Sequence, residues 1–152
     1  MNPQAAQHYL RTRVLTATPE QLQLMLYDGA LRFGQQARIA IQAKNYALSY
    51  NLIMRVEGII TEMNGSMKRD VAPELCGKLS ALYNYAYRKL IEANIHHKVD
   101  ALDEAMQVLK YQRETWVLLM NELTRQKAQA AAARLDIPAP HAAMEASISM
   151  HG

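Results

Sequence analysis

The chain has 152 residues, of which 50% are hydrophobic, 7% aromatic and 20% charged. Its 17 basic and 14 acidic residues leave a formal net charge of +3, too small an excess to indicate a nucleic-acid partner. This length suits one domain with a sizeable core, and the low aromatic content favours an all-α fold over a β-sandwich.

The sequence carries no pattern of secretion or of membrane insertion. Its single cysteine, Cys76, allows no intramolecular disulfide and suits a reducing compartment. No apolar run approaches the roughly 20 residues of a membrane-spanning helix, and residues 1–8 lack the charged and apolar regions of a signal peptide. We therefore expect a cytoplasmic protein without a membrane segment.

Residues 1–17 predict a polar N-terminal arm with a weak helical signal. Apolar side chains in such an arm indicate that it docks on the domain. The first well-marked helix begins after the arm, because Thr18 and Gln21 have the spacing of a capping box and Pro19 between them suits the first helical position. This helix is expected to run to about residue 43.

Three more helices are expected, and short links join them. Residues 44–45 predict a tight link, residues 64–66 a stop, and residues 70–73 a third helix start with Asp70 available as a cap. The four predicted starts are evenly spaced, at Pro19, Tyr46, Pro73 and Asp100. Because short links make neighbours antiparallel, we expect an up-down-up-down four-helix bundle over residues 18–127. Residues 128–152 are expected to form a tail: its Ala-rich part up to Arg134 could extend the last helix, and the part from Asp136 onward, with two Pro, is expected to be disordered.

Each predicted helix has an apolar seam with alternating spacings of three and four, which is typical of bundle packing. The seams are Leu22, Met25, Leu26, Gly29 and Phe33; Leu48, Leu52, Val56, Ile59 and Met63; Leu75, Leu79, Leu82, Ala86, Leu90 and Ala93; and Leu102, Ala105, Leu109, Gln112, Trp116, Leu119 and Leu123. In the first three helices a second apolar or tyrosine-rich stripe runs beside the seam. Either these stripes widen the core, or they line a groove for a partner.

The groove interpretation has a physical basis. Fully burying a Leu or Ile side chain is worth ~1.5–3 kcal/mol, so an exposed row would drive self-association unless a partner or the arm covered it. Tyrosines suit such a surface, because they offer a large contact area and a polar tip that tolerates water.

The sequence offers no pattern for catalysis, a metal or a cofactor. It has no Glu-x-x-His pair of the kind that di-metal bundles use, and its histidines fall in a predicted loop, the arm and the tail. Gly29 has no phosphate-binding glycine pattern around it, and neither Cys76 nor any Ser has an evident His and acid partner. We therefore expect a protein that is not an enzyme.

Three segments, in order and correctly spaced, resemble motifs of the FliS family of flagellar secretion chaperones. The first is residues 15–22 with 25–30, LTATPEQL and MLYDGA; the second is residues 82–94, LYNYAYRKLIEAN; the third is residues 113–116, RETW. The resemblance covers about residues 9–126. Two departures are Thr18, where the family commonly has Ser, and Gln112, where an apolar residue would be unsurprising.

The resemblance implies an antiparallel helical bundle that binds the disordered C-terminal segment of flagellin in apolar grooves. It implies that binding prevents premature polymerisation and presents flagellin to the export gate of the flagellar type III apparatus. An anti-sigma factor is a further partner to consider. The alternative function is a self-associating structural or adaptor bundle, and a helical nucleic-acid or metal-storage protein is a weaker rival.

The resemblance also implies that the arm covers part of the client site, so that Tyr9 and Val14 occupy a client pocket in the free protein. For the groove itself we predict six residues: Met25, Tyr27, Ile53, Ile60, Tyr83 and Tyr87. Six others are assigned to the core: Leu22, Leu26, Leu52, Val56, Leu82 and Trp116.

Overall fold

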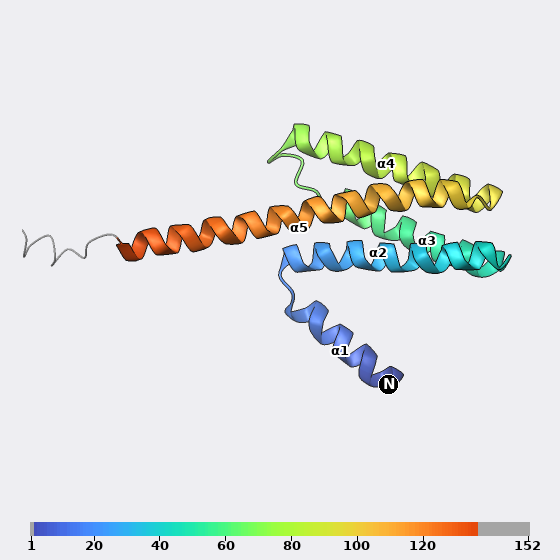
Figure 1. Ribbon diagram of the computed structural model, residues 1–152, viewed down its shortest axis with the longest axis horizontal. Helices are drawn as coiled ribbons and strands as arrows, with labels where there is room; N and C mark the ends of the chain where they lie inside the picture. Colours follow the sequence, from blue (N-terminus) through green and yellow to red (C-terminus); the bar gives the residue numbers. More distant parts are fainter. Residues whose placement is uncertain (1, 137–152) are drawn as a thin grey trace, which may run out of the picture. The chain divides into compact units, whose positions relative to one another are not determined.

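The computed structural model describes residues 2–136 and, over that range, consists of helices and turns (Figure 1). The helices are α1 (Pro3–Thr16), α2 (Pro19–Gln42), α3 (Tyr46–Gly65), α4 (Pro73–His96) and α5 (Val99–Asp136). The chain divides into two compact units within α5, after Trp116. The prediction of an all-α helical bundle is confirmed by α2, α3, α4 and the first part of α5.

Local signals set the helix starts. At the start of α2, the Gln21 backbone N–H donates to Thr18 Oγ1 at 3.1 Å, and the Thr18 N–H donates to Gln21 Oε1 at 3.0 Å, which completes the predicted capping box. At α4 the cap differs from the prediction: the N-cap residue is Ala72, two positions after Asp70, and its methyl side chain makes no hydrogen bond. Pro73 still opens that helix.

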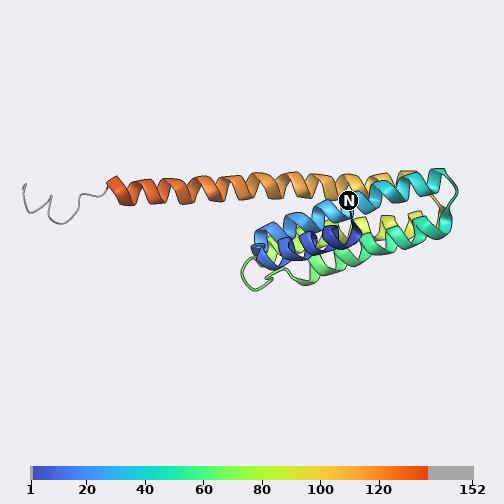
Figure 2. The same ribbon diagram turned by 90° about the horizontal axis from the view of Figure 1, so that it is seen from below.

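The arm is more regular than predicted, since residues 3–16 form α1. The same signals that start α2 also start α1: Asn2 Oδ1 accepts from the Gln4 backbone N–H at 3.0 Å, and Pro3 follows at the first helical position. The sequence reading missed this cap. No residue of α1 is buried, and Figure 1 shows the helix diverging from α2 on the outer side of the bundle, which Figure 2 shows from below.

The core lies between α2, α3, α4 and residues 99–116 of α5. From α2 it takes mostly small residues, Ala30, Ala37 and Ala40, which let α3 pack close to it. The buried side chains of α5 follow the predicted seam: Leu102, Ala105, Leu109 and Gln112. Both amide atoms of Gln112 are buried without a hydrogen-bond partner in the described chain.

In the N-terminal parts of α3 and α4 the buried face differs from the prediction, whereas Leu52, Val56, Ala86 and Leu90 are buried as predicted. Leu48, Leu75 and Leu82 are exposed, and Ser49, Cys76 and Tyr83, each one position later, are buried in their place. Each helix has two neighbouring apolar stripes, and spacing alone does not decide which one faces inward. In α4 Tyr83 is buried in place of Leu82 because its hydroxyl has a buried hydrogen-bond partner, described below.

The second unit contains the rest of α5. Residues 117–136 continue the helix without a break, so residues 128–136, expected to belong to the tail, are helical. A run of Ala between positions 128 and 133 explains this, because Ala has the highest helix propensity. Leu119 and Leu123, expected in the core, are 47% and 42% exposed, since their own unit has no second helix among its described residues. The rest of the predicted tail, residues 137–152, lies outside the described residues.

Within residues 2–136, no helix is both long enough and apolar enough to cross a membrane.

Candidate binding surface

Two grooves run along the two sides of α5 in the first unit. The first, between α2 and α5, has a volume of about 620 Å³. It is lined by Leu31, Gly34, Gln35 and Arg38 from α2, and by Asp103, Met106, Gln107, Lys110, Arg113 and Glu114 from α5. It combines an apolar floor with charged walls, which is the chemistry of a surface that binds an amphipathic chain.

Gly34 determines how this groove is built. A Cβ atom added at Gly34 would lie 1.8 Å from Met106 Sδ and 3.0 Å from both neighbouring carbons of that side chain. The thioether therefore rests directly on the α2 backbone. Any larger residue at position 34 would push Met106 into the space of the groove.

Polar contacts fasten α5 to α2 along the groove. Arg38 and Asp103 form a bidentate ion pair, with Nε to Oδ1 at 2.9 Å and Nη2 to Oδ2 at 3.3 Å. Towards the other end Arg113 pairs with Asp28. There Trp116 Nε1 donates to the Glu20 backbone oxygen at 3.1 Å, so Trp116, assigned to the core, is only partly buried.

The second groove lies between α4 and α5 and has a volume of about 540 Å³. Leu82 and Tyr85 line it from α4, together with Glu104, Gln107, Val108, Lys110, Tyr111 and Glu114 from α5. Three large side chains here are open to solvent: Leu82 at 37%, Tyr85 at 36% and Tyr111 at 64%. Gln107, Lys110 and Glu114 line both grooves, so they form the ridge between them.

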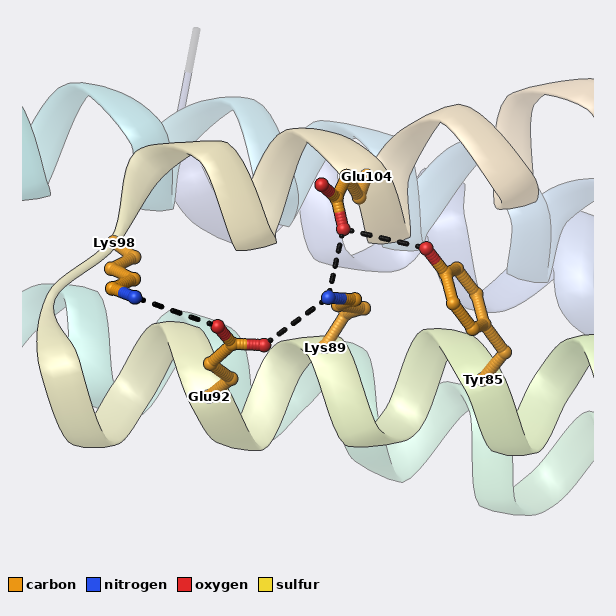
Figure 3. A network of polar contacts seen from close by, with 5 residues as sticks. All are labelled: Tyr85, Lys89, Glu92, Lys98 and Glu104. Carbon is orange, nitrogen blue, oxygen red and sulfur yellow. Dashed lines mark hydrogen bonds and ion pairs between the residues drawn. The ribbon is translucent and has the colours of Figure 1, made fainter.

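A polar network joins α4 to α5, and two of its members, Tyr85 and Glu104, also line the α4/α5 groove (Figure 3). Lys89 contacts Glu104 at 3.0 Å and Glu92 at 3.3 Å, and the Tyr85 hydroxyl donates to the same Glu104 oxygen at 3.3 Å. Lys98 adds a longer pair with Glu92 at 3.7 Å. Hydrogen bonds to Glu104 and Glu92 raise the pKa of Lys89, and its ammonium lowers the pKa of Glu92. These groups are partly exposed, so the network positions α4 against α5 more than it stabilises the fold.

Four of the predicted groove residues are core residues. Tyr27, Ile53, Ile60 and Tyr83 are all 3% exposed or less, which corrects the expectation that they line an open groove. The two tyrosines are buried as a pair, because their hydroxyls form a 2.7 Å hydrogen bond that satisfies both polar tips. Burial, together with the bond to Tyr27, raises the pKa of Tyr83 far above its ordinary value.

The other four predicted residues are more accessible. Met25 lines a small groove between α1 and α2, where Arg13 of the arm also lies. Tyr87 is half-buried and packs against the core. Tyr9 and Val14 are 64% and 43% exposed on α1, so in this structure neither fills a pocket. Contact of these eight residues with a client stays a prediction.

The sequence reading missed most of the groove-lining residues. Leu82 had been assigned to the core, and Tyr111, Met106 and Gly34 had not been singled out. Two features of the sequence could have indicated them. Leu82 and Tyr83 are adjacent and only one of them can face the core, and Tyr111 lies next to the seam residue Gln112 and so outside the α5 seam. In the described part of the chain, no three His, Cys, Asp or Glu side chains gather in a way that could hold a metal ion.

The fold and the grooves define a class, a small all-α bundle with an open groove on each side of its last helix. A solved structure titled "Crystal structure of flagellar chaperone from bacteria" has the same fold, with a TM-score of 0.65 over 78% of this chain and 97% of that one. At 18% sequence identity it supports the fold alone.

Sequence comparisons identify the family. The family model described as "Flagellar protein FliS" matches residues 1–123. The flagellar secretion chaperone FliS of Bacillus subtilis (strain 168) is 35% identical over 115 residues, which is 76% of this chain and 84% of that protein. The FliS of Salmonella typhimurium is 28% identical over 112 residues, 73% of this chain and 83% of its own length. The chain belongs to the FliS family, and the resemblance inferred from the three motifs is confirmed. Because this is a family of chaperones, the prediction of a protein that is not an enzyme is confirmed too.

Proposed function

We propose that the chain is a cytoplasmic flagellar export chaperone that holds the C-terminal segment of flagellin in the two grooves beside α5. The observation that carries this proposal is the pair of grooves, which share the ridge of Gln107, Lys110 and Glu114. A flexible client that crosses this ridge would fill both grooves with one continuous segment.

The chemistry of the grooves supports an amphipathic helical client. Apolar side chains on the floor, Leu31 and Met106 on one side and Leu82 and Val108 on the other, would accept the apolar face of a helix. Charged residues on the walls would meet its polar face. A segment that becomes ordered on binding loses conformational entropy, so the affinity is moderate for the area buried. Moderate affinity suits a chaperone that must release its client.

Binding of this kind would keep flagellin from polymerising before export and would present it to the flagellar type III export gate. The export gate is thus a second proposed partner, engaged when client is bound. An anti-sigma factor is a third predicted partner. Met25 and Tyr87, and α1 with Tyr9 and Val14, are proposed to contact the client at the margins of the α5 grooves.

The test compares two exposed tyrosines that differ in position. Tyr111→Asp places a charge in the α4/α5 groove, whereas Tyr50→Asp places one on α3, where Tyr50 is 52% exposed and lines neither groove. Tyrosines at the centre of an interface often contribute about 2 kcal/mol or more. We therefore expect Tyr111→Asp to weaken binding of a flagellin C-terminal peptide by at least about tenfold, measured by calorimetry, with the melting temperature unchanged. Equal affinities for the two variants would exclude the α4/α5 groove as the client site.

A further inference from the structure

Two arginines from neighbouring helices share one aromatic ring on the face formed by α2 and α3. The guanidinium carbon of Arg32 on α2 lies 5.4 Å from the centre of the Phe33 ring, and that of Arg55 on α3 lies 5.3 Å from it. Both arginines are exposed, whereas Phe33 is half-buried and packs against the core. Because an arginine stacks well on an aromatic ring, Phe33 holds two cations at one place on the surface.

Neither cation has an acidic partner. Arg32 and Arg55 form no ion pair within residues 2–136, and Asp28, one turn before Arg32, pairs with Arg113 instead. Like charges held close together repel, and a carboxylate placed between them removes this repulsion. The two arginines therefore favour an anionic group from outside the described chain.

The packing of α2 on α3 fixes the positions of these arginines. The two helices run side by side and are joined by residues 43–45, as Figure 2 shows. A Cβ placed on Gly29 of α2 would lie 3.6 Å from Ile59 Cδ1 and 3.9 Å from Arg32 Nη2. The tip of the Arg32 side chain thus lies near Ile59, which follows Arg55 by one turn of α3.

Exposed aliphatic side chains continue this face towards the link between α2 and α3. Ile39 follows Arg32 by two turns of α2, and Leu48 precedes Arg55 by two turns of α3. Residues at this spacing share one side of a helix. Ile39 is 57% exposed and Leu48 is 47% exposed. The α2/α3 face therefore combines aliphatic surface with two unpaired guanidiniums.

This composition selects among possible occupants. A second copy in a two-fold contact centred on Phe33 would bring four arginines together, which opposes self-association. Nucleic acid is held by many phosphate contacts, and this face offers two cations. A carboxylate matches the guanidinium fork through two parallel hydrogen bonds, and aliphatic side chains would pack on Ile39 and Leu48. The best fit is a helix with one aliphatic and one acidic side.

We propose that the α2/α3 face binds an acidic amphipathic helix of a partner protein other than flagellin. Two carboxylates one turn apart on that helix pair with Arg32 and Arg55, and its aliphatic side chains pack along Ile39 and Leu48. None of these four residues lines a groove beside α5. The chain therefore holds this partner and its client at the same time, a consequence that rests on the proposed function.

A synthetic peptide is the probe for this surface, an amphipathic helix with leucine on one side and glutamate on the other. Calorimetry measures its affinity for the full chain. We expect Arg32→Glu and Arg55→Glu each to weaken binding by at least about tenfold. The matched control is Arg88→Glu, which reverses an exposed arginine on α4 that has no ion pair within residues 2–136 and should bind as the wild type does. Thermal melts check that all three variants are folded, which is expected because the side chains are exposed.

Charge exchange ties the effect to the two arginines. The double variant Arg32→Glu, Arg55→Glu should lose the glutamate peptide and bind a version in which lysine replaces glutamate. A wild type that does not bind the glutamate peptide overturns the proposal. So does a version with glutamine in place of glutamate that binds equally well, or an equal loss of affinity in Arg88→Glu.

The other occupants give different results. Sedimentation velocity should show the same oligomeric state for the wild type and Arg55→Glu. A dimer that Arg55→Glu dissociates would assign the face to a second copy. Binding of duplex DNA that both arginine variants abolish would assign it to nucleic acid, and either result overturns the proposal.

Competition with the flagellin C-terminal peptide separates this inference from the proposed function. We expect both peptides to bind together, and flagellin binding to be unchanged in Arg32→Glu and Arg55→Glu. If the flagellin peptide displaces the acidic peptide, the α2/α3 face belongs to the client site and the inference is wrong, while the chaperone function stands. If the acidic peptide binds through the arginines and the flagellin peptide does not bind, the proposed function is wrong while the α2/α3 surface stands.

Discussion

Gly34 leaves room for the Met106 side chain against α2, and so shapes the α2/α5 groove. A methyl group at this position would overlap Met106 Sδ, so Gly34→Ala should displace the Met106 side chain and strain the contact between the helices. Overpacking of this kind typically costs about 1–3 kcal/mol. Urea denaturation followed by circular dichroism measures it.

Gly58 provides the matched control, because it lies in the interior of α3 and a Cβ there would meet nothing within 4 Å. Gly58→Ala should stabilise the protein by about 0.4–1 kcal/mol through the lower entropy of the unfolded chain. Destabilisation by Gly58→Ala as well would show that glycine at 34 has no special role in packing.

Glu57 is a buried carboxyl on α3 that forms no ion pair among the described residues. Loss of hydration on burial raises the pKa of Glu57, so the folded state favours the protonated form more than the unfolded chain does. Its contribution to stability is therefore complete below the ordinary pKa of a glutamate and is lost as the pH rises through the higher folded-state pKa.

Removing this charge should stabilise the protein at neutral pH. We expect Glu57→Gln to raise the free energy of unfolding at pH 7, because the amide carries no charge that burial would strip of its hydration. The gain should vanish near pH 3–4, where a glutamate is neutral in either state. Urea denaturation at both pH values checks this, with the exposed Glu62→Gln as control. A gain of equal size at low pH would mean that charge is not the cause.

At the scale of the helix, α1 contributes no residue to the core. Deletion of residues 2–16 should therefore change the melting temperature of the dilute chain by no more than about 2 °C, since no α1 residue is buried. Differential scanning calorimetry at low concentration measures this. A fall of more than about 5 °C would mean that α1 packs on its own bundle in solution.

Helix positions were predictable where a local signal sets them. Thr18, Pro19 and Gln21 placed the start of α2 correctly, and Pro73 placed that of α4. The start of α1 carries the same kind of signal, in Asn2 and Pro3, and was missed because the polar composition of residues 1–17 outweighed it. The apolar seam ends near residue 126, and for this reason the last bundle helix was expected to end near residue 127. Helix α5 continues to Asp136, because the Ala run favours a helix even where no apolar seam is present.

Helix orientation was harder to predict than helix position. From Ala86 onward the α4 seam is as expected, but one turn earlier Leu82 and Tyr83 are both suitable core residues. The hydrogen bond between the Tyr27 and Tyr83 hydroxyls explains why Tyr83 faces the core. This bond joins residues far apart in the sequence, so the spacing of apolar residues within α4 does not predict it. The grooves were out of reach for a similar reason, because their depth depends on how far α5 lies from α2 and α4.

For the whole molecule, α5 is the helix on which the proposed function depends. It supplies one wall to each groove, the ridge between them and the acidic partners of Arg38 and Lys89. A client segment that follows α5 on both sides would cover both grooves and the ridge between them. Family membership agrees with this arrangement, since the matched relatives are flagellar secretion chaperones.

The measurement that most directly tests the account is co-purification of the full chain with flagellin, with and without the C-terminal segment of flagellin. We predict a stable complex with intact flagellin that is lost when the segment is deleted, and that is weakened by Tyr111→Asp and retained by Tyr50→Asp. Equal recovery of flagellin with and without its C-terminal segment would contradict the account.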